Sequence, residues 1–251
     1  MGWWSRLKKA VKHAVKWVGQ KAKALVRTVF RIVLAVVLWG VNIWDFFFGF
    51  LNWPPKNLTL HIVILSDNNG RLVPEKDLIP SIEYARRVLK DRLNIKLRAY
   101  SRTFVQTLKE PAPNAALDTK PCTPSGIFQD EFGDAGEFFA KHIAGWNAVP
   151  ISFRFPITAF IIRDVTGGYI GCSAGLFGDY VLVDVDGVKD NPASTMMHEI
   201  GHSCNIFDHY WTSIKDLMFA DSHDAMGNIR GDRITWGKRN LIRSSRHVTY
   251  W

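Results

Sequence analysis

Apolar residues recur at three- and four-residue spacing over residues 1–31, with lysine and arginine between them. This pattern predicts an amphipathic helix. Its basic face suits a helix lying on anionic lipid headgroups, and the alternative is a surface helix packed on its own domain.

Residues 32–51 (IVLAVVLWGVNIWDFFFGFL) carry a single charge, Asp45. Because such a run can cross a hydrocarbon layer of about 30 Å, we predict a transmembrane helix over residues 32–53. A carboxylate at mid-membrane would cost about 2.5–3.5 kcal/mol, and less toward the end of the span, where Asp45 lies.

The pattern changes after Trp53-Pro54-Pro55-Lys56, which marks a domain boundary and leaves residues 57–251 as a second unit. Within this unit, alternating or continuous apolar runs predict strands, and three- and four-residue spacing predicts helices. The expected strands cover residues 58–65, 94–105, 158–166, 167–174 and 179–186, and the expected helices cover 79–93, 131–146 and 195–204. Residues 109–126 are rich in proline and small residues and predict a loop.

The net charge of +9 comes entirely from the N-terminus. Nine of the 32 basic residues lie within residues 1–44, where no acidic residue occurs, so the other 23 balance the 23 acidic ones. This distribution disfavours a basic groove for nucleic acid, and we expect no nucleic-acid partner. It also predicts a single-pass membrane protein, attached through residues 1–53, with its N-terminus in the cytoplasm and the remaining domain outside.

The segment from Thr195 to Cys204 contains the pattern H-E-x-x-H. His198 and His202 are four residues apart, so a helix presents both imidazoles on one face, where they can share a metal ion. Glu199 lies next to that site, where a carboxylate can take a proton from water bound to the metal. Asn205 follows three residues after His202 and tolerates the left-handed conformation that ends helices. A sharp turn there would bring Asp208 back toward the two histidines, and Met218 follows ten residues later.

This constellation resembles the metzincin clan of zinc endopeptidases, including its matrixin, reprolysin and snapalysin types. His198, Glu199, His202, Asp208 and Met218 match the clan's two-part motif in order and spacing, with Asn205 in place of the usual glycine. The resemblance covers about residues 57–251. It implies an α+β fold with a mixed five-stranded sheet, an active-site helix and a C-terminal helix. It also implies a Zn²⁺ cofactor and a protein or peptide substrate.

The resemblance assigns a role to each residue of the motif. Glu199 is the expected general base, and Met218 is expected to form an apolar floor under the ligands. His198 and His202 are the first two expected zinc ligands. We prefer Asp208 as the third, which is the spacing of the snapalysin type, and His209 is the alternative if the loop is one residue longer. Residues 167–174 lie where this fold places its edge strand, so Gly171, Cys172 and Ser173 are expected to bind an extended substrate.

These observations together predict a membrane-anchored zinc-dependent endopeptidase. The alternative is a membrane-active cationic protein whose metzincin-like domain only binds, and an intact Glu199 disfavours it. The charges of the C-terminal segment, residues 231–248, are expected to form a solvated face. The resemblance brings the strand of Cys172 close to the helix that carries Cys204, so we predict a Cys172–Cys204 disulfide. The competing states are Cys122–Cys172, Cys122–Cys204 and three free thiols.

Overall fold

The long strand β1 (Lys56–Asp67) is the centre of a mixed sheet. The structure is a computed structural model, and it describes residues 42–144, 155–173, 178–190, 193–209 and 213–250, with isolated positions from 18 to 40. Along one edge of β1 lie the parallel strands β3 and β4, and along the other lie antiparallel β10 and parallel β6. The sheet continues from β6 to parallel β9 and ends at antiparallel β8. The other strands of this sheet are β2 (Gly70–Arg71), β3 (Ile95–Ala99), β4 (Val105–Pro111), β6 (Ile157–Ile162), β8 (Gly171–Ser173), β9 (Tyr180–Asp184) and β10 (Val248–Thr249).

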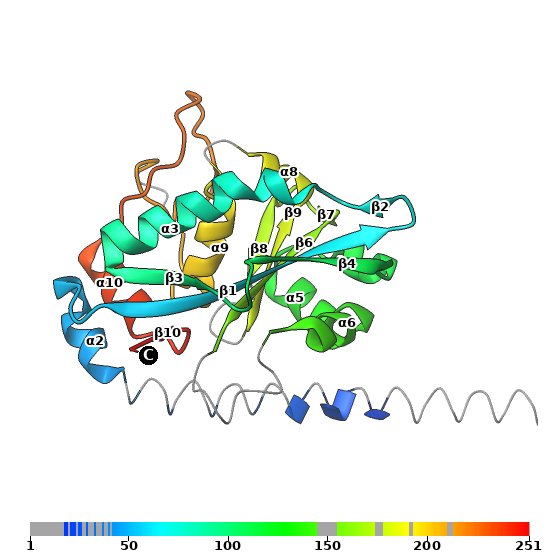
Figure 1. Ribbon diagram of the computed structural model, residues 1–251, viewed down its shortest axis with the longest axis horizontal. Helices are drawn as coiled ribbons and strands as arrows, with labels where there is room; N and C mark the ends of the chain where they lie inside the picture. Colours follow the sequence, from blue (N-terminus) through cyan, green and yellow to red (C-terminus); the bar gives the residue numbers. More distant parts are fainter. Residues whose placement is uncertain are drawn as a thin grey trace, which may run out of the picture.

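Helices cover both faces of this sheet (Figure 1). Because strand side chains alternate between faces, Leu60 and Ile62 of β1 pack against α3 and α9, whereas Val63 and Leu65 pack on the side of α4 and α6. The described helices are α2 (Ile43–Phe48), η1 (Gly49–Leu51), η2 (Glu75–Leu78), α3 (Ile79–Leu93), α4 (Asn114–Leu117), α5 (Pro124–Glu131), α6 (Asp134–His142), α8 (Val185–Lys189), α9 (Thr195–Ser203) and α10 (Trp236–Arg243). The expected mixed α+β architecture is therefore present.

Several expected elements differ from the observed ones. The sheet has eight described strands instead of five, partly because the expected strand 94–105 bends away at residues 100–104 and becomes β3 and β4. The expected loop 109–126 contains α4, β5 (Asp118–Thr119) and the start of α5, and β5 pairs with β7 (Asp164–Val165). Pro124, one of the four prolines in this segment, is the first residue of α5, a position where the missing N–H costs nothing.

The C-terminal half of the expected membrane span packs on the domain instead. Helix α2 and η1 lie against α10 (Figure 1), and Asp45 is fully buried between Lys56 and Arg243. The helix ends at η1 because Asn52 adopts a left-handed conformation (φ 53°). No helix within the described residues has the length and apolar character needed to cross a membrane. The expected amphipathic helix 1–31 and most of residues 32–41 lie outside the described residues.

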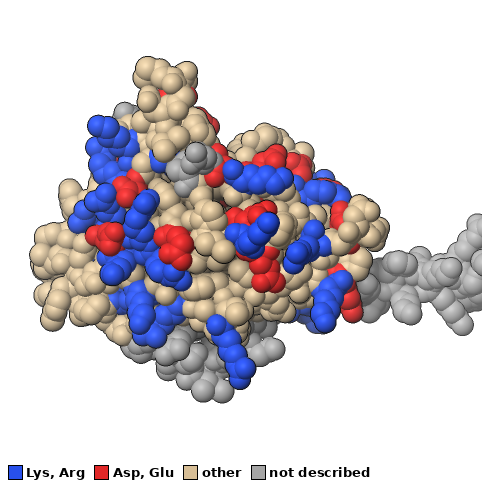
Figure 2. Space-filling model, turned by 45° about the horizontal axis from the view of Figure 1, so that its top comes forward, with Lys and Arg blue, Asp and Glu red and all other residues tan. Residues whose placement is uncertain are grey.

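Helix α10 also differs from the expectation of a solvated basic face. Arg243 is fully buried, and Arg246 just beyond the helix is 3% exposed, whereas Trp236 is 71% exposed. Arg246 reaches Asp179 at 2.6 Å. Elsewhere, on the face shown in Figure 2, basic and acidic side chains are interspersed.

Candidate metal centre

Helix α9 holds the first two histidines of the motif on one face. The Nε2 atoms of His198 and His202 lie 3.1 Å apart, which is the consequence of their four-residue spacing on a helix. His198 is almost fully buried and His202 is half-buried. The sequence therefore placed these two side chains correctly with respect to each other.

The chain turns back after α9 through Asn205, whose φ of 71° is left-handed. The side chain of Asn205 donates to the Leu241 carbonyl at 3.1 Å, which fixes the turn against α10. This turn brings the Nε2 atom of His209 to 3.1 Å from that of His202 and 3.2 Å from that of His198. Among the described residues, His198, His202 and His209 form the group that could hold a metal ion, and Asp208 does not belong to it. The geometry thus brings His209, the alternative third ligand expected from the sequence, close to the two helical histidines.

Backbone carbonyls fix the tautomers of the two helical histidines. Nδ1 of His198 donates to the Leu217 carbonyl at 2.9 Å, and Nδ1 of His202 donates to the Ile206 carbonyl at 2.7 Å. With the proton on Nδ1, the lone pair of each Nε2 atom points into the shared space, which is the usual arrangement of metal-binding histidines.

Burial keeps these imidazoles neutral. It lowers the pKa of His198 well below its usual value and that of His202 to about 4, and it also lowers the pKa of His209. Neutral imidazole nitrogens are the form that binds zinc. The three Nε2 atoms lie within 3.2 Å of one another, and a set of three imidazoles at this spacing fits Zn²⁺. The ring of His209 is partly enclosed by the protein while its side chain reaches the surface, which leaves one side of the group open to solvent.

Glu199 lies between α9 and the edge strand β8. A Cβ atom built on Gly171 would be 2.8 Å from its Oε1 atom, so the carboxylate packs directly against the strand backbone. Burial raises the pKa of Glu199 to about 8, against an opposing effect of the Arg230 charge. A carboxyl group with such a pKa can both accept and release a proton near neutral pH.

Met218 lies beneath the helix that carries the histidines, as the resemblance implied. It is fully buried, and a Cβ atom on Gly201 would be 2.7 Å from its sulfur. Its backbone N–H donates to Asp216 at 3.0 Å, and the preceding Leu217 supplies the carbonyl that fixes His198. The turn therefore supports α9 by packing and by a hydrogen bond to the metal site.

Strand β8 is the edge of the sheet, and it contains Gly171, Cys172 and Ser173. Ser173 Oγ lies 2.9 Å from Ser203 Oγ of α9, so the strand runs beside the metal helix. The predicted Cys172–Cys204 disulfide is wrong, because Cys172 is bonded to Cys122 with the Cα atoms 5.5 Å apart. Cys204 is a buried free thiol on the other side of the helix, and burial raises its pKa to about 12.

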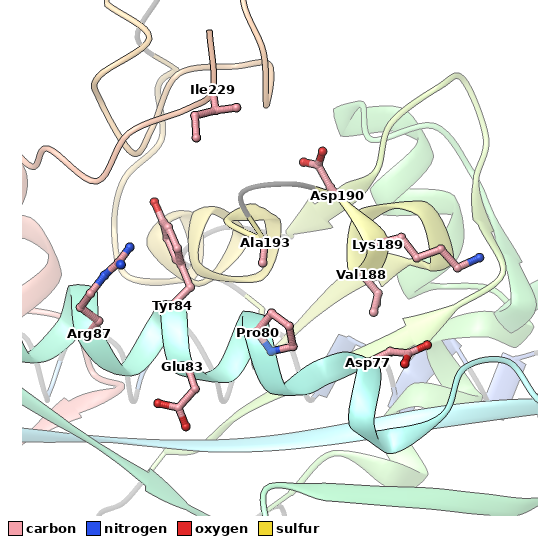
Figure 3. A pocket seen from close by; sticks show the side chains of 10 residues that line it. All are labelled: Asp77, Pro80, Glu83, Tyr84, Arg87, Val188, Lys189, Asp190, Ala193 and Ile229. Atoms are coloured by element: carbon pink, nitrogen blue, oxygen red, sulfur yellow. The ribbon is translucent and has the colours of Figure 1, made fainter. Parts of the chain in front are cut away.

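A cavity of about 900 Å³ opens beside the N-terminal end of α9. Tyr84 of α3, Asp190 and Ala193 surround its centre, and Ile229 closes it from the opposite side (Figure 3). Asp190 accepts from Thr195 Oγ1 at 3.4 Å, which connects the cavity wall to the first turn of the metal helix. This cavity could not be predicted from the sequence, because its walls come from three segments that are distant in the chain.

No family model matches the chain, and no curated protein matches it in sequence. It is similar to solved structures of peptidases at low identity. These include metalloproteinase-II from Bacteroides fragilis (14% identity, TM-score 0.45, covering 75% of this chain and 53% of that one). They also include mirolysin in complex with compound 9 (13%, 0.47, 76% and 91%) and Tannerella forsythia mature mirolysin in complex with a cleaved peptide (11%, 0.46, 76% and 91%). The chain spans about half the length of the first. All three TM-scores are below 0.5, so these similarities do not assign a function to this chain.

Proposed function

We propose that this protein hydrolyses peptide bonds with a zinc ion held by His198, His202 and His209. The observation that carries the proposal is the convergence of three Nε2 atoms within 3.2 Å of one another, one residue away from a buried carboxylate. A bound zinc ion would polarise the scissile carbonyl and lower the pKa of a water molecule. The open side at His209 gives substrate and water access to the site.

Glu199 is the proposed general base. Its carboxylate accepts the proton of the attacking water and then passes it to the leaving amine. Burial raises the pKa of Glu199, and the charge of a bound zinc ion would oppose this shift and favour the carboxylate form that accepts a proton. Gly171 packs against Glu199 and restricts the position of its carboxylate.

Strand β8 is the proposed binding site for the substrate backbone. As the edge strand it can pair with an extended peptide, which would then run past Glu199. The Cys122–Cys172 bridge anchors the middle of this strand from the face opposite the metal helix.

The decisive experiment compares Glu199→Gln with the wild-type protein in metal content and peptide cleavage. We expect about one zinc per chain in both proteins, and turnover reduced by a factor on the order of 10²–10⁴ in the variant, because the base is lost and the ligands are not. The exposed Glu110 on β4 provides the control, and Glu110→Gln should keep full turnover. Undiminished cleavage by Glu199→Gln would rule out the proposed mechanism, and a zinc-bound but inactive wild-type protein would favour the binding-only alternative.

We further propose that the N-terminal segment attaches the enzyme to a membrane. Large apolar side chains of α2 and of the residues that follow η1 are exposed, among them Trp44 (51%), Phe47 (59%) and Trp53 (66%). Aromatic rings of this kind favour the bilayer interface, and they directly follow the apolar run 32–41. The full chain should stay with membranes through a carbonate wash, whereas Trp44→Ser combined with Phe47→Ser should weaken binding of the protein to anionic vesicles. Ready release of the wild-type chain would contradict the anchor.

A further inference from the structure

Arg230 is a buried cation, and in the described part of the chain two of its three side-chain nitrogens have no hydrogen-bond partner. Its side chain is 3% exposed, and neither its Nε nor its Nη1 atom has a hydrogen-bond partner among the described residues. Other buried arginines of this chain are paired, as Arg243 is with Asp45 and Arg246 with Asp179. Since an unpaired buried guanidinium is costly, its retention indicates a ligand that this structure does not contain.

Arg230 follows a residue of the cavity wall in the chain and lies close to the metal site. The preceding residue, Ile229, lines the cavity, and the Gly231 carbonyl accepts from the Tyr84 hydroxyl at 3.0 Å. The Arg230 N–H donates to the Ser222 carbonyl at 2.7 Å, which holds the segment in place. The charge of Arg230 acts on Glu199 and on His198, so the guanidinium is within electrostatic reach of the reacting groups.

The surrounding carboxylates do not serve as its partner. Asp190 accepts from Thr195 and lies 3.9 Å from Nδ1 of His223. Asp77 and Glu83 lie at the end of the cavity opposite Ile229 (Figure 3). Glu199, Asp190 and Asp221 act on Arg230 through their charges, but within the described residues none of them accepts a hydrogen bond from its Nε or Nη1 atom. A ligand with anionic oxygens would supply acceptors for these two nitrogen atoms.

We propose that Arg230 binds a carboxylate of the peptide substrate at the cavity end next to the metal site. This inference rests on the proposed peptidase function and adds its specificity: the enzyme selects substrates with an acidic side chain near the scissile bond or with a nearby C-terminal carboxylate. The cavity of about 900 Å³ has room for such a side chain. A charge-assisted pair in a buried site typically changes affinity roughly ten- to a hundredfold.

The test uses the full-length zinc-loaded protein and one cleavable peptide prepared in matched forms. Glutamate or glutamine is placed in turn at each position flanking the scissile bond, and each peptide carries a free or an amidated C-terminus. Cleavage gives kcat/KM, and calorimetry gives equilibrium binding to the Glu199→Gln protein. We expect kcat/KM and affinity roughly tenfold or more higher for one carboxylate-bearing form. A preference for glutamate regardless of amidation identifies the acidic side chain, and a preference for the free acid identifies the C-terminus.

Two arginine variants and one control assign the preference to its residue. Arg230→Gln should bring the ratio between the carboxylate and amide forms close to one, and Arg230→Lys should keep part of it. Arg87 lines the cavity and its side chain is exposed to solvent. Arg87→Gln should therefore leave the ratio between the carboxylate and amide forms unchanged. If Arg230→Gln does not fold, the wild-type ratio and the lysine variant decide the question.

Three outcomes would overturn the inference. These are equal treatment of all peptide forms by the wild type, an intact preference in Arg230→Gln, and an equal loss of activity on every form in that variant. The last would place Arg230 at the reacting atoms instead. Carboxylate-selective binding without any cleavage would support Arg230 as the anion site and refute the peptidase proposal.

Discussion

Asp45 and Arg243 are 198 residues apart in the chain, yet their side chains form an ion pair of 3.1 Å from which solvent is excluded. Lys56 Nζ lies 3.0 Å from the same carboxylate, and the Tyr250 hydroxyl donates to it as well. Asn42 donates to the Ser245 carbonyl at 3.1 Å. The segment before β1 and the end of the chain are therefore joined through one buried charged cluster.

Asp45→Asn should destabilise the protein by about 3–5 kcal/mol, because two buried cations would lose their counter-charge. Urea unfolding followed by circular dichroism measures this change. The exposed Asp91 on α3 serves as control, and Asp91→Asn should change the free energy of unfolding by less than about 0.5 kcal/mol. The same reasoning predicts that a fragment of residues 42–251 is more stable than one of residues 57–251. Equal stability of the two fragments would show that the cluster contributes nothing.

His209→Ala should weaken zinc binding roughly a hundredfold or more, whereas Asp208→Ala should leave it nearly unchanged. The reason is that Nε2 of His209 lies 3.1–3.2 Å from the Nε2 atoms of both helical histidines. Competition with a chromophoric chelator gives the affinities. A large loss in Asp208→Ala with little change in His209→Ala would restore the ligand set preferred from the sequence.

Stability should fall with acid partly through His247, which is remote from the metal site. Burial is the main cause that lowers its pKa from the ordinary 6.5 of histidine to about 4, and its Nδ1 donates to the Phe155 carbonyl at 2.8 Å. Because the folded pKa is depressed, the unfolded chain binds the extra proton. The contribution is complete above about pH 6.5 and is lost as the pH falls toward 4, by up to about 3 kcal/mol.

Unfolding free energies of wild type and His247→Asn, measured from pH 7.5 to 4.5 with a chelator present, test this. The asparagine variant should have the flatter pH profile, even if it is less stable at pH 7.5. The other histidines are common to both proteins and cancel in the difference. Parallel profiles would exclude His247 as the acid-sensitive group.

Gly171→Ala should reduce peptide cleavage strongly while zinc remains bound. The added methyl group would come within 2.8–3.0 Å of Glu199 and Thr195, so the carboxylate must move from its present position. Overpacking of this kind costs about 1–3 kcal/mol of stability. Gly237 of α10 has open space around its Cβ position, so Gly237→Ala should retain activity. Full activity in Gly171→Ala would mean that the position of Glu199 is not restricted by β8.

The sequence was informative where one local periodicity determined the outcome. The four-residue spacing of His198 and His202 and the left-handed Asn205 follow from local rules, whereas the edge position of residues 171–173 was implied by the resemblance. The third ligand could not be fixed in this way, because a one-residue difference in a turn decides between neighbours. The predicted membrane span illustrates the same limit. Asp45 was expected to be a cost within an apolar run, and only tertiary contacts with Arg243 show that it is a counter-ion.

Arg230 and the partners of Cys172 were beyond local reasoning for a further reason. Each depends on segments that meet only in the folded chain, as the 50-residue separation of Cys122 and Cys172 illustrates. A buried arginine is indistinguishable in sequence from an exposed one. The basic residues of the C-terminal segment were therefore misjudged together, although Arg243 is fully buried.

The Cys122–Cys172 bridge also has a consequence for the integrity of the chain in the presence of peptidases, including other copies of itself. It closes a loop across 50 residues, and any single cut within that loop leaves both pieces covalently joined. A nicked molecule would therefore keep β8 attached beside the metal helix. On a non-reducing gel it would migrate near the intact chain, and reduction would separate two fragments. Apparent resistance to autolysis should accordingly be judged only after the bridge has been opened.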